Sequence, residues 1–250
     1  MTSRRRVVAG LLGLALFLTS CGEAASTVNE QATSQETAPD EQVTSLQTSE
    51  TSPDGRVVSL TTTACGDASR TSGAGVIVED GWVLVSAHVV SGAGSVEVSG
   101  EFGAEAAEIV VWDDVADLAL LAVPSAQSSP IETAFSSAGD VVSLAGGGPS
   151  GSLEAAISRG VEVRIEAVRS EERISRVGYE IDVRVQLGDS GGGVYDEAGR
   201  LVGVVFGRTA EDESRSFIVG ADQIREVLSA DRTNQWSCSP PEHRIRPNDS

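Results

Sequence analysis

The chain carries one serine whose neighbours suit it to act as a nucleophile. Ser190 lies inside the stretch Gly188-Asp189-Ser190-Gly191-Gly192. A nucleophilic serine needs a base that takes its proton and amide donors that hold the oxyanion formed during attack. The glycines let the backbone curl until the N–H groups of Gly188 and Ser190 point at one spot and form an oxyanion hole. The same five residues could also form a plain glycine-rich hairpin turn, so their meaning depends on the residues upstream.

A histidine and an aspartate of the required kind both precede Ser190. His88 ends the apolar run that starts at Trp82, so a strand would deliver it into a loop. Asp117 opens the apolar run that continues to Val123, and so lies at the edge of a buried strand. On its own His88 could be an ordinary core histidine, but the order His88, Asp117, Ser190 is one in which catalytic triads occur. We therefore expect Ser190 to attack a carbonyl carbon, His88 to act as the base and Asp117 to orient the imidazole.

Other residues of the same types are weaker candidates. His243, the second of the two histidines, lies in a proline-rich, charged tail, where we expect it to face solvent. Asp113 and Asp114 lie in an expected turn and do not directly precede the apolar run. Because the sequence has no further histidine and no cluster of cysteines, it predicts no metal and no other cofactor.

Three blocks of the sequence resemble the signature of the trypsin-like (chymotrypsin-fold) serine proteases. These blocks are Ser86-Ala87-His88-Val89-Val90, Asp117-Leu118-Ala119-Leu120-Leu121 and Gly188-Asp189-Ser190-Gly191-Gly192. More narrowly, four features resemble the actinobacterial periplasmic proteases of the membrane-anchored acid-resistance type, namely Cys65-Gly66, Gly73-Ala74-Gly75-Val76, the run from Leu201 to Gly207, and the late Cys238. The resemblance covers residues 57–238 and departs from the pattern at Gly193, where most relatives have proline.

The resemblance implies a serine endopeptidase that cleaves protein or peptide substrates of the cell envelope through an acyl-enzyme. A protease-like domain that has become a catalytically silent binding module of the envelope is the main alternative, and a structural envelope lipoprotein is the third. The intact set of His88, Asp117 and Ser190, together with the glycines around the serine, favours the enzyme.

The sequence predicts an all-β fold over residues 57–238, because short apolar runs there are broken by Gly, Asp and Ser. The resemblance implies two six-stranded β-barrels of the chymotrypsin type, joined by a connector over residues 125–139, with the triad in the cleft between them. The expected strands of the first barrel are 57–62, 74–78, 82–86, 95–98, 108–112 and 118–123. Those of the second are 141–145, 155–168, 179–187, 193–195, 201–206 and 216–219. A closing C-terminal helix is predicted over residues 221–230.

Asp189 poses a separate question. In trypsin-like enzymes the acid just before the serine is usually paired with a cation, often a new N-terminus exposed by activation. This chain shows no such activation motif. The resemblance then implies an internal cation, for which Arg159 is a candidate, or regulation of another kind.

The resemblance also implies a primary substrate pocket. Arg184, six residues before Ser190, would stand at its base. Strand alternation puts Arg184 on the same face as Asp182 and Gln186, and this face either lines the pocket or points to solvent. In the first case basic P1 residues would be rejected and acidic or small ones preferred, because like charges repel in a partly desolvated slot. The walls of the pocket would be formed by Val205, Phe206, Gly207 and Arg215.

Residues 1–21 resemble a bacterial lipoprotein signal peptide. Arg4 to Arg6 form a basic start, and the apolar stretch that follows is too short to span a bilayer, which takes about 20 residues. Leu18-Thr19-Ser20-Cys21 resembles a lipobox, with cleavage before Cys21 and acyl chains such as palmitate attached there. The alternatives are an ordinary secretory signal cut nearby and a buried core strand. A lipidated Cys21 would anchor the exported protein to the extracytoplasmic face of the bacterial cell membrane.

The segments on either side of the expected domain are polar. Residues 22–56 are dominated by Ser, Thr, Glu, Gln and Ala, so we expect a disordered acidic tether there and a flexible tail over residues 239–250. The chain has a formal net charge of −19 and contains no lysine, and removal of the signal would take away three more positive charges. This balance argues against nucleic acid as a partner and favours a well-solvated surface.

Cys65 and Cys238 bracket the expected domain. If Cys21 carries lipid, these are the two remaining cysteines, and an oxidising compartment would allow a disulfide between them. Two unrelated thiols are the alternative.

The lipobox leads to a first prediction. Because Cys21→Ser removes the thiol that would receive the lipid, the variant should leave the membrane fraction or keep its signal uncleaved. Cell fractionation and mass determination of the N-terminus measure both outcomes, and the peptidase activity of the soluble domain should stay unchanged. A processed Cys21→Ser protein that still sediments with the membrane would contradict the lipobox.

Overall fold

The computed structural model describes residues 53–66, 68–145, 148–166, 173–208, 212–232 and 238. The expected lipoprotein signal with Cys21, nearly all of the expected tether, and the tail with His243 lie outside the described residues. All described residues belong to one compact unit, Thr48–Ser250. Within them, no helix is long and apolar enough to cross a membrane.

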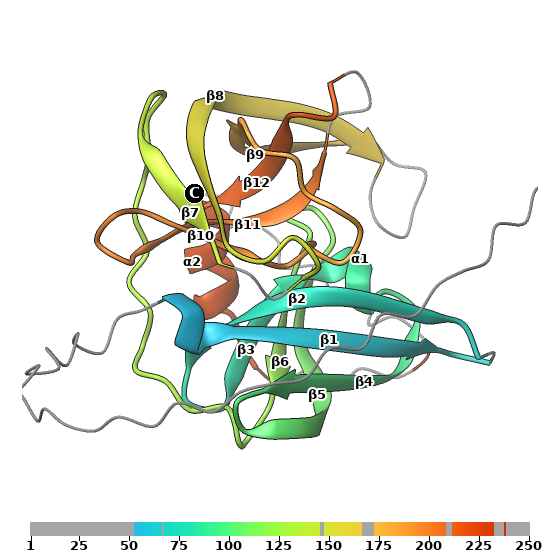
Figure 1. Ribbon diagram of the computed structural model, residues 1–250. Coiled ribbons are helices and arrows are strands. Elements are labelled where there is room, and N and C mark those ends of the chain that lie inside the picture. Colours follow the sequence, from blue (N-terminus) through green and yellow to red (C-terminus); the bar gives the residue numbers. More distant parts are fainter. Residues whose placement is uncertain are drawn as a thin grey trace, which may run out of the picture. The chain divides into compact units, whose positions relative to one another are not determined.

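The first six strands close into a barrel (Figure 1). Their order around it is β1-β2-β3-β6-β5-β4, and each strand is antiparallel to its neighbours. A 3-10 helix, η1 (Pro53–Arg56), precedes the barrel, and a four-residue helix, α1 (Ala87–Val90), follows its third strand. The strands are β1 (Val57–Ala64), β2 (Arg70–Glu79), β3 (Trp82–Ser86), β4 (Ala93–Gly100), β5 (Gly103–Asp113) and β6 (Leu118–Ala122).

The last six strands close into a second barrel, in the order β10-β11-β12-β9-β8-β7. The helix α2 (Ala221–Ser229) follows it directly, with Ile224 and Val227 fully buried. The strands are β7 (Val141–Leu144), β8 (Leu153–Glu166), β9 (Arg173–Ile181), β10 (Gly193–Tyr195), β11 (Leu201–Arg208) and β12 (Ser216–Gly220).

The apolar runs of β3 and β6 are continuous because both faces of these strands are buried. Val85 and Leu121 point into the core of the first barrel. Their neighbours Leu84 and Leu120 point the other way and join a cluster that also contains Tyr195 of the second barrel. The two barrels are therefore held together by apolar burial, contributed by strands that each serve two cores at once.

The expected fold is confirmed, since two six-stranded barrels and a closing helix are present. One strand prediction was wrong: the expected strand 179–187 starts at Arg173 and ends at Ile181. Beyond Ile181 regular strand pairing ends: Asp182 N still donates to Ala156 O of β8 (3.1 Å), and Ser216 Oγ then donates to Val183 O (2.6 Å) and accepts from Val185 N (3.2 Å). The alternation argument for Arg184 therefore does not apply.

The departure from proline at Gly193 has a packing reason. A Cβ atom at this position would lie 2.6 Å from the hydroxyl of Tyr195 and 2.7 Å from a methyl of Val76. Tyr195 is fully buried between the barrels. The glycine thus makes room for a large aromatic side chain at the centre of the interface.

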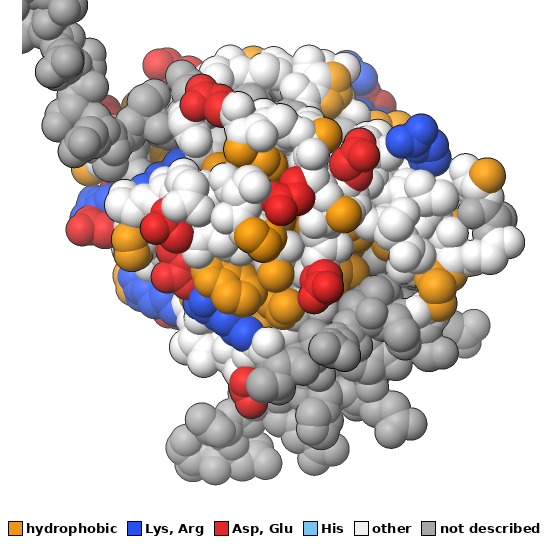
Figure 2. Space-filling model, turned by 90° about the horizontal axis from the view of Figure 1, so that it is seen from below, with side chains coloured by type: hydrophobic (Ala, Val, Ile, Leu, Met, Phe, Trp, Pro, Cys, Tyr) orange, Lys and Arg blue, Asp and Glu red, His pale blue; other side chains and the backbone are white. Residues whose placement is uncertain are grey.

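The surface carries many acidic side chains. Figure 2 shows them scattered among neutral and apolar ones over one face, which agrees with a solvated acidic surface.

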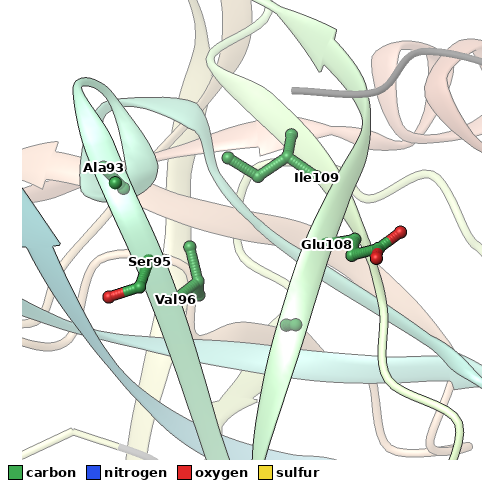
Figure 3. A pocket seen from close by; sticks show the side chains of 7 residues that line it. Ala93, Ser95, Val96, Glu108 and Ile109 are labelled. Atoms are coloured by element: carbon green, nitrogen blue, oxygen red, sulfur yellow. The ribbon is translucent and has the colours of Figure 1, made fainter. Parts of the chain in front are cut away.

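The first barrel has a cavity between two of its strands. Pairing between β4 and β5 ends at Val96 and Ala107, and beyond this pair the strands separate around a cavity of about 330 Å³ (Figure 3). None of the candidate site residues lines this cavity.

A disulfide joins Cys65, just after β1, to Cys238. The expected disulfide is therefore present, and the alternative of two unrelated thiols does not apply. The two cysteines are 173 residues apart in sequence, with 5.6 Å between their Cα atoms. The bond therefore encloses nearly the whole two-barrel unit in one covalent loop, which restricts the unfolded chain strongly.

The disulfide leads to a second prediction. The double variant Cys65→Ser, Cys238→Ser should lose about 2–5 kcal/mol in free energy of unfolding, because its unfolded chain gains entropy. Urea denaturation of both proteins measures the difference. A reductant should lower the stability of the wild type to the same level and leave the variant unchanged. Equal denaturation midpoints of wild type and variant without reductant would contradict this role.

Candidate active site

His88 is positioned by a strand that ends in a single helical turn. Ser86, the last residue of β3, is fully buried, and its hydroxyl donates to Val205 O on the second barrel (2.8 Å). In α1 the side chains of Val89 and Val90 are buried, whereas the side chain of His88 is 36% exposed. The buried turn thus presents the imidazole at the edge of the barrel interface.

Asp117 fixes both the backbone and the ring of His88. Its Oδ1 accepts from the His88 amide (2.8 Å), and its Oδ2 lies 2.7 Å from His88 Nδ1. A carboxylate can only accept, so Nδ1 carries the proton and Nε2 is left to act as the base. Asp117 is 1% exposed and has a φ of +60°, the only positive value of a non-glycine residue within the described ranges. The acid therefore occupies a strained backbone position, as functional residues often do.

The rival acids Asp113 and Asp114 have other contacts. Asp113 Oδ1 accepts from the amides of Val115 and Ala116, both at 2.9 Å, and so shapes the turn that leads to Asp117. Burial raises the pKa of the Asp113 carboxyl, and these two hydrogen bonds oppose that shift. No contact with His88 is found for either residue among the described parts of the chain.

Ser190 lies in the loop between β9 and β10 and is held against the first barrel. Its carbonyl accepts from the amide of Ala74 (2.8 Å), and the amide of Gly191 donates to Val205 O (2.8 Å). A Cβ atom at Gly73 would lie 2.6 Å from Val89 of α1 and 3.0 Å from Ser190 O. A glycine at position 73 thus lets the backbone of Ser190 come close to the helix that carries His88.

The amides of Gly188 and Ser190 are available as donors. Neither N–H group donates to another residue within the described ranges. Gly188 has a φ of +102°, a conformation that a residue with a side chain would adopt only under strain. These two amides fit the oxyanion hole expected from the sequence.

Asp189 is buried and is held by neutral donors. Its Oδ2 accepts from the amide of Gln186 (2.7 Å) and from the hydroxyl of Ser150, and its Oδ1 accepts from the amide of Ser150 (3.1 Å). A Cβ atom at Gly148 would clash with this carboxylate. Arg159, the candidate partner, pairs instead with Glu180 (2.6 Å).

A pocket of about 360 Å³ opens beside His88. Phe206 and Gly207, two of the expected wall residues, line it, whereas Val205 is fully buried beneath the surface. The rings of Phe206 and Phe217 stack with their centroids 5.8 Å apart and give the pocket an apolar wall. The lining residues are His88, Asp117, Val163, Ile165, Arg176, Phe206, Gly207, Arg208 and Phe217.

Arg184 and Arg215 lie outside this pocket. Arg184 is exposed and forms an ion pair with the equally exposed Glu213 (2.6 Å), which favours the solvent-facing alternative. Arg215 pairs with the buried Glu180 (2.6 Å). Burial alone would raise the pKa of Glu180, but the hydrogen bonds from Arg215 and Arg159 outweigh it and lower that pKa.

Sequence reasoning missed five residues of the pocket: Val163, Ile165, Arg176, Arg208 and Phe217. Arg176 is the most notable, because it is buried within reach of Asp117. Burial lowers the pKa of its guanidinium, and the nearby carboxylates oppose that shift. One feature of the sequence could have indicated its burial. Arg176 comes two residues after Ile174, so both side chains lie on the same face of the strand, and both are buried.

The two barrels, with a histidine–aspartate pair on one and a glycine-flanked serine on the other, define the chymotrypsin-like class of proteins. The chain belongs to the trypsin-like peptidase domain family, which matches residues 73–204, just over half of its length.

Two curated relatives illustrate this membership. Serine protease Rv3671c of Mycobacterium tuberculosis is 32% identical over 163 residues, which are 63% of this chain and 41% of that protein. Serine endoprotease DegS of Haemophilus influenzae is 31% identical over 167 residues, which are 62% of this chain and 48% of that protein. The chain thus spans less than half the length of each.

Solved structures of the first relative match the fold. The active form of the Rv3671c protease superposes with a TM-score of 0.68 at 26% identity, covering 74% of this chain and 86% of the other. The inactive form gives a TM-score of 0.62 at 27% identity, covering 71% of this chain and 89% of the other.

The pocket leads to a third prediction. Phe206→Ala removes an aromatic wall beside His88, so kcat/KM for peptide substrates with large apolar side chains should fall about tenfold. Steady-state kinetics with a peptide series measure the loss. The matched control is Phe135→Ala, since Phe135 is 60% exposed and does not line the pocket. Equal effects of the two substitutions would remove the pocket from substrate binding.

Proposed function

We propose that this protein is an exported, lipid-anchored serine endopeptidase in which Ser190 is the nucleophile. The observation that carries the proposal is the pair of contacts from Asp117 to the backbone and ring of His88 on the first barrel. The second barrel supplies Ser190, a serine set among glycines whose carbonyl bonds to Ala74 of the first barrel. Membership of the trypsin-like peptidase family supports the same reaction class.

The reaction follows from these groups. Ser190 Oγ attacks the carbonyl carbon of a peptide bond while His88 Nε2 takes its proton, and Asp117 stabilises the imidazolium that forms. The amides of Gly188 and Ser190 donate to the oxyanion of the tetrahedral intermediate. His88 then protonates the leaving amine, and the resulting ester on Ser190 is hydrolysed by water along the same route. No metal or other cofactor takes part in this scheme.

Two observations support the proposal that the site is competent without an activating cleavage. The active form of the Rv3671c protease superposes on this chain with a higher TM-score than the inactive form does. The carboxylate of Asp189 is satisfied by Ser150 and Gln186 of the same chain, so the loop that carries Ser190 needs no new N-terminus for its order.

The proposed location is the extracytoplasmic face of the bacterial cell membrane, with lipid on Cys21. It is supported by the sequence of residues 1–21 and by the name of one relative from Halomonas elongata, a probable periplasmic serine endoprotease. The substrates would be proteins or peptides of the cell envelope, because these share the compartment. The disulfide between Cys65 and Cys238 suits an oxidising environment.

The second candidate function is a catalytically silent, protease-like binding module. Covalent labelling by a fluorophosphonate distinguishes the two, because only an activated serine reacts with it. The enzyme predicts labelling on Ser190, and a silent module predicts none.

The triad leads to a fourth prediction. Ser190→Ala and His88→Ala should each reduce turnover by several orders of magnitude, and the double variant should lose little more, because the triad acts as a unit. The measurement is kcat on a cleaved peptide, with thermal unfolding as a check that each variant folds. Additive losses, or activity that survives in Ser190→Ala, would overturn the assignment.

A further inference from the structure

A buried arginine of the second barrel lies against the carboxylate of Asp117. Arg176 extends from β9, is 3% exposed, and has its Nη1 3.5 Å from Asp117 Oδ2. The same oxygen accepts the 2.7 Å bond from His88 Nδ1. The acid that orients the histidine of the first barrel is therefore also in contact with a cation of the second.

The guanidinium is held by the turn that leads to Asp117. Its Nε donates to Val115 O (2.9 Å), and its Nη2 donates to Asp114 O (3.3 Å). Its central carbon lies over the Phe206 ring, 4.7 Å from the ring centre, so the group packs against the aromatic wall of the pocket. A planar fork with several donors suits this set of acceptors, whereas a single ammonium does not reproduce it.

The turn needs a cation because it concentrates negative charge. Asp113, Asp114 and Asp117 lie within five residues, and each is less than a tenth exposed. Burying a carboxylate without a partner costs a great deal of free energy. Asp117 in addition has a left-handed backbone, with a φ of +60°. The guanidinium supplies positive charge to this acidic turn and lies 3.5 Å from the Asp117 carboxylate.

We infer that Arg176 is a positioning residue of the active site, through which the second barrel holds Asp117 in line with His88. This inference rests on the proposed peptidase function. Without the guanidinium, the turn relaxes and the imidazole loses its orientation. Arg176 also lines the pocket, but its polar contacts run to Asp117 and to the turn before it, so we expect the main effect on the chemical step.

The test compares Arg176→Met with Arg159→Met in the disulfide-bonded protein. Methionine keeps much of the length of arginine and removes its charge, so kcat of Arg176→Met should fall about 100-fold, the cost of a misplaced catalytic group, with KM little changed. Arg159 comes from the neighbouring strand, and its partner Glu180 keeps Arg215, so Arg159→Met should retain wild-type kcat. Similar kcat values in the two variants, both folded, would overturn the role of Arg176.

Arg176→Lys and a proton spectrum make the test independent of folding in the methionine variant. Lysine keeps the charge but not the fork, so kcat should fall about tenfold at unchanged KM, between wild type and Arg176→Met. The proton between His88 Nδ1 and Asp117 should give a low-field NMR signal in the wild type that shifts in Arg176→Lys. Wild-type kcat with an unshifted signal in a folded Arg176→Lys would overturn the inference. A wild type that neither cleaves peptides nor reacts with a fluorophosphonate would instead overturn the peptidase function itself.

Discussion

The hydrogen bond from the amide of Ala74 to the carbonyl of Ser190 joins the two barrels where the candidate site is formed. His88 and Asp117 belong to the first barrel and Ser190 to the second. The distance between His88 and Ser190 therefore depends on how the two barrels pack together. Apolar burial around Tyr195 supplies most of the free energy of docking. Apolar burial has no preferred direction, so it does not fix the distance between the two barrels. That distance is set by hydrogen bonds between them and by glycines that allow the two backbones to come close.

Two buried acids among the described residues obtain cationic partners from distant segments. Asp117 meets Arg176 of the other barrel, and Glu180 meets Arg159 and Arg215. Because the sequence contains no lysine, every such cation is a guanidinium, which remains charged when buried and can donate to several acceptors at once. A surplus of acid in the sequence thus coexists with buried ion pairs at Asp117 and Glu180.

The sequence allowed the fold to be predicted because its signals are local: short apolar runs mark the strands. Three short blocks likewise single out His88, Asp117 and Ser190 as the candidate triad, and the structure shows the contact between the first two. Other features depend on contacts that leave no local trace. The expected strand through residue 187 ends at Ile181, and the backbone at Val183 and Val185 bonds to the hydroxyl of Ser216, more than thirty residues later.

The polarity of the residues in β9 does not indicate which of their side chains are buried. Arg176 is buried there, while its neighbour Val177 is 54% exposed, the reverse of what hydrophobicity alone predicts. The partner of Asp189 was equally hidden, because Ser150 is a neutral residue 39 positions away and a cation was expected. Long-range polar contacts of this kind become visible only when the chain is folded.

The way in which Asp189 is satisfied bears on when the protein can work. A nucleophile loop that waits for a cut elsewhere in the chain can be stored in a dormant form and switched on once. Here the donors Ser150 and Gln186 belong to the second barrel itself, so under the proposed function competence would arise with folding. The activity of such a protein would then be limited by its location and by the substrates that reach it.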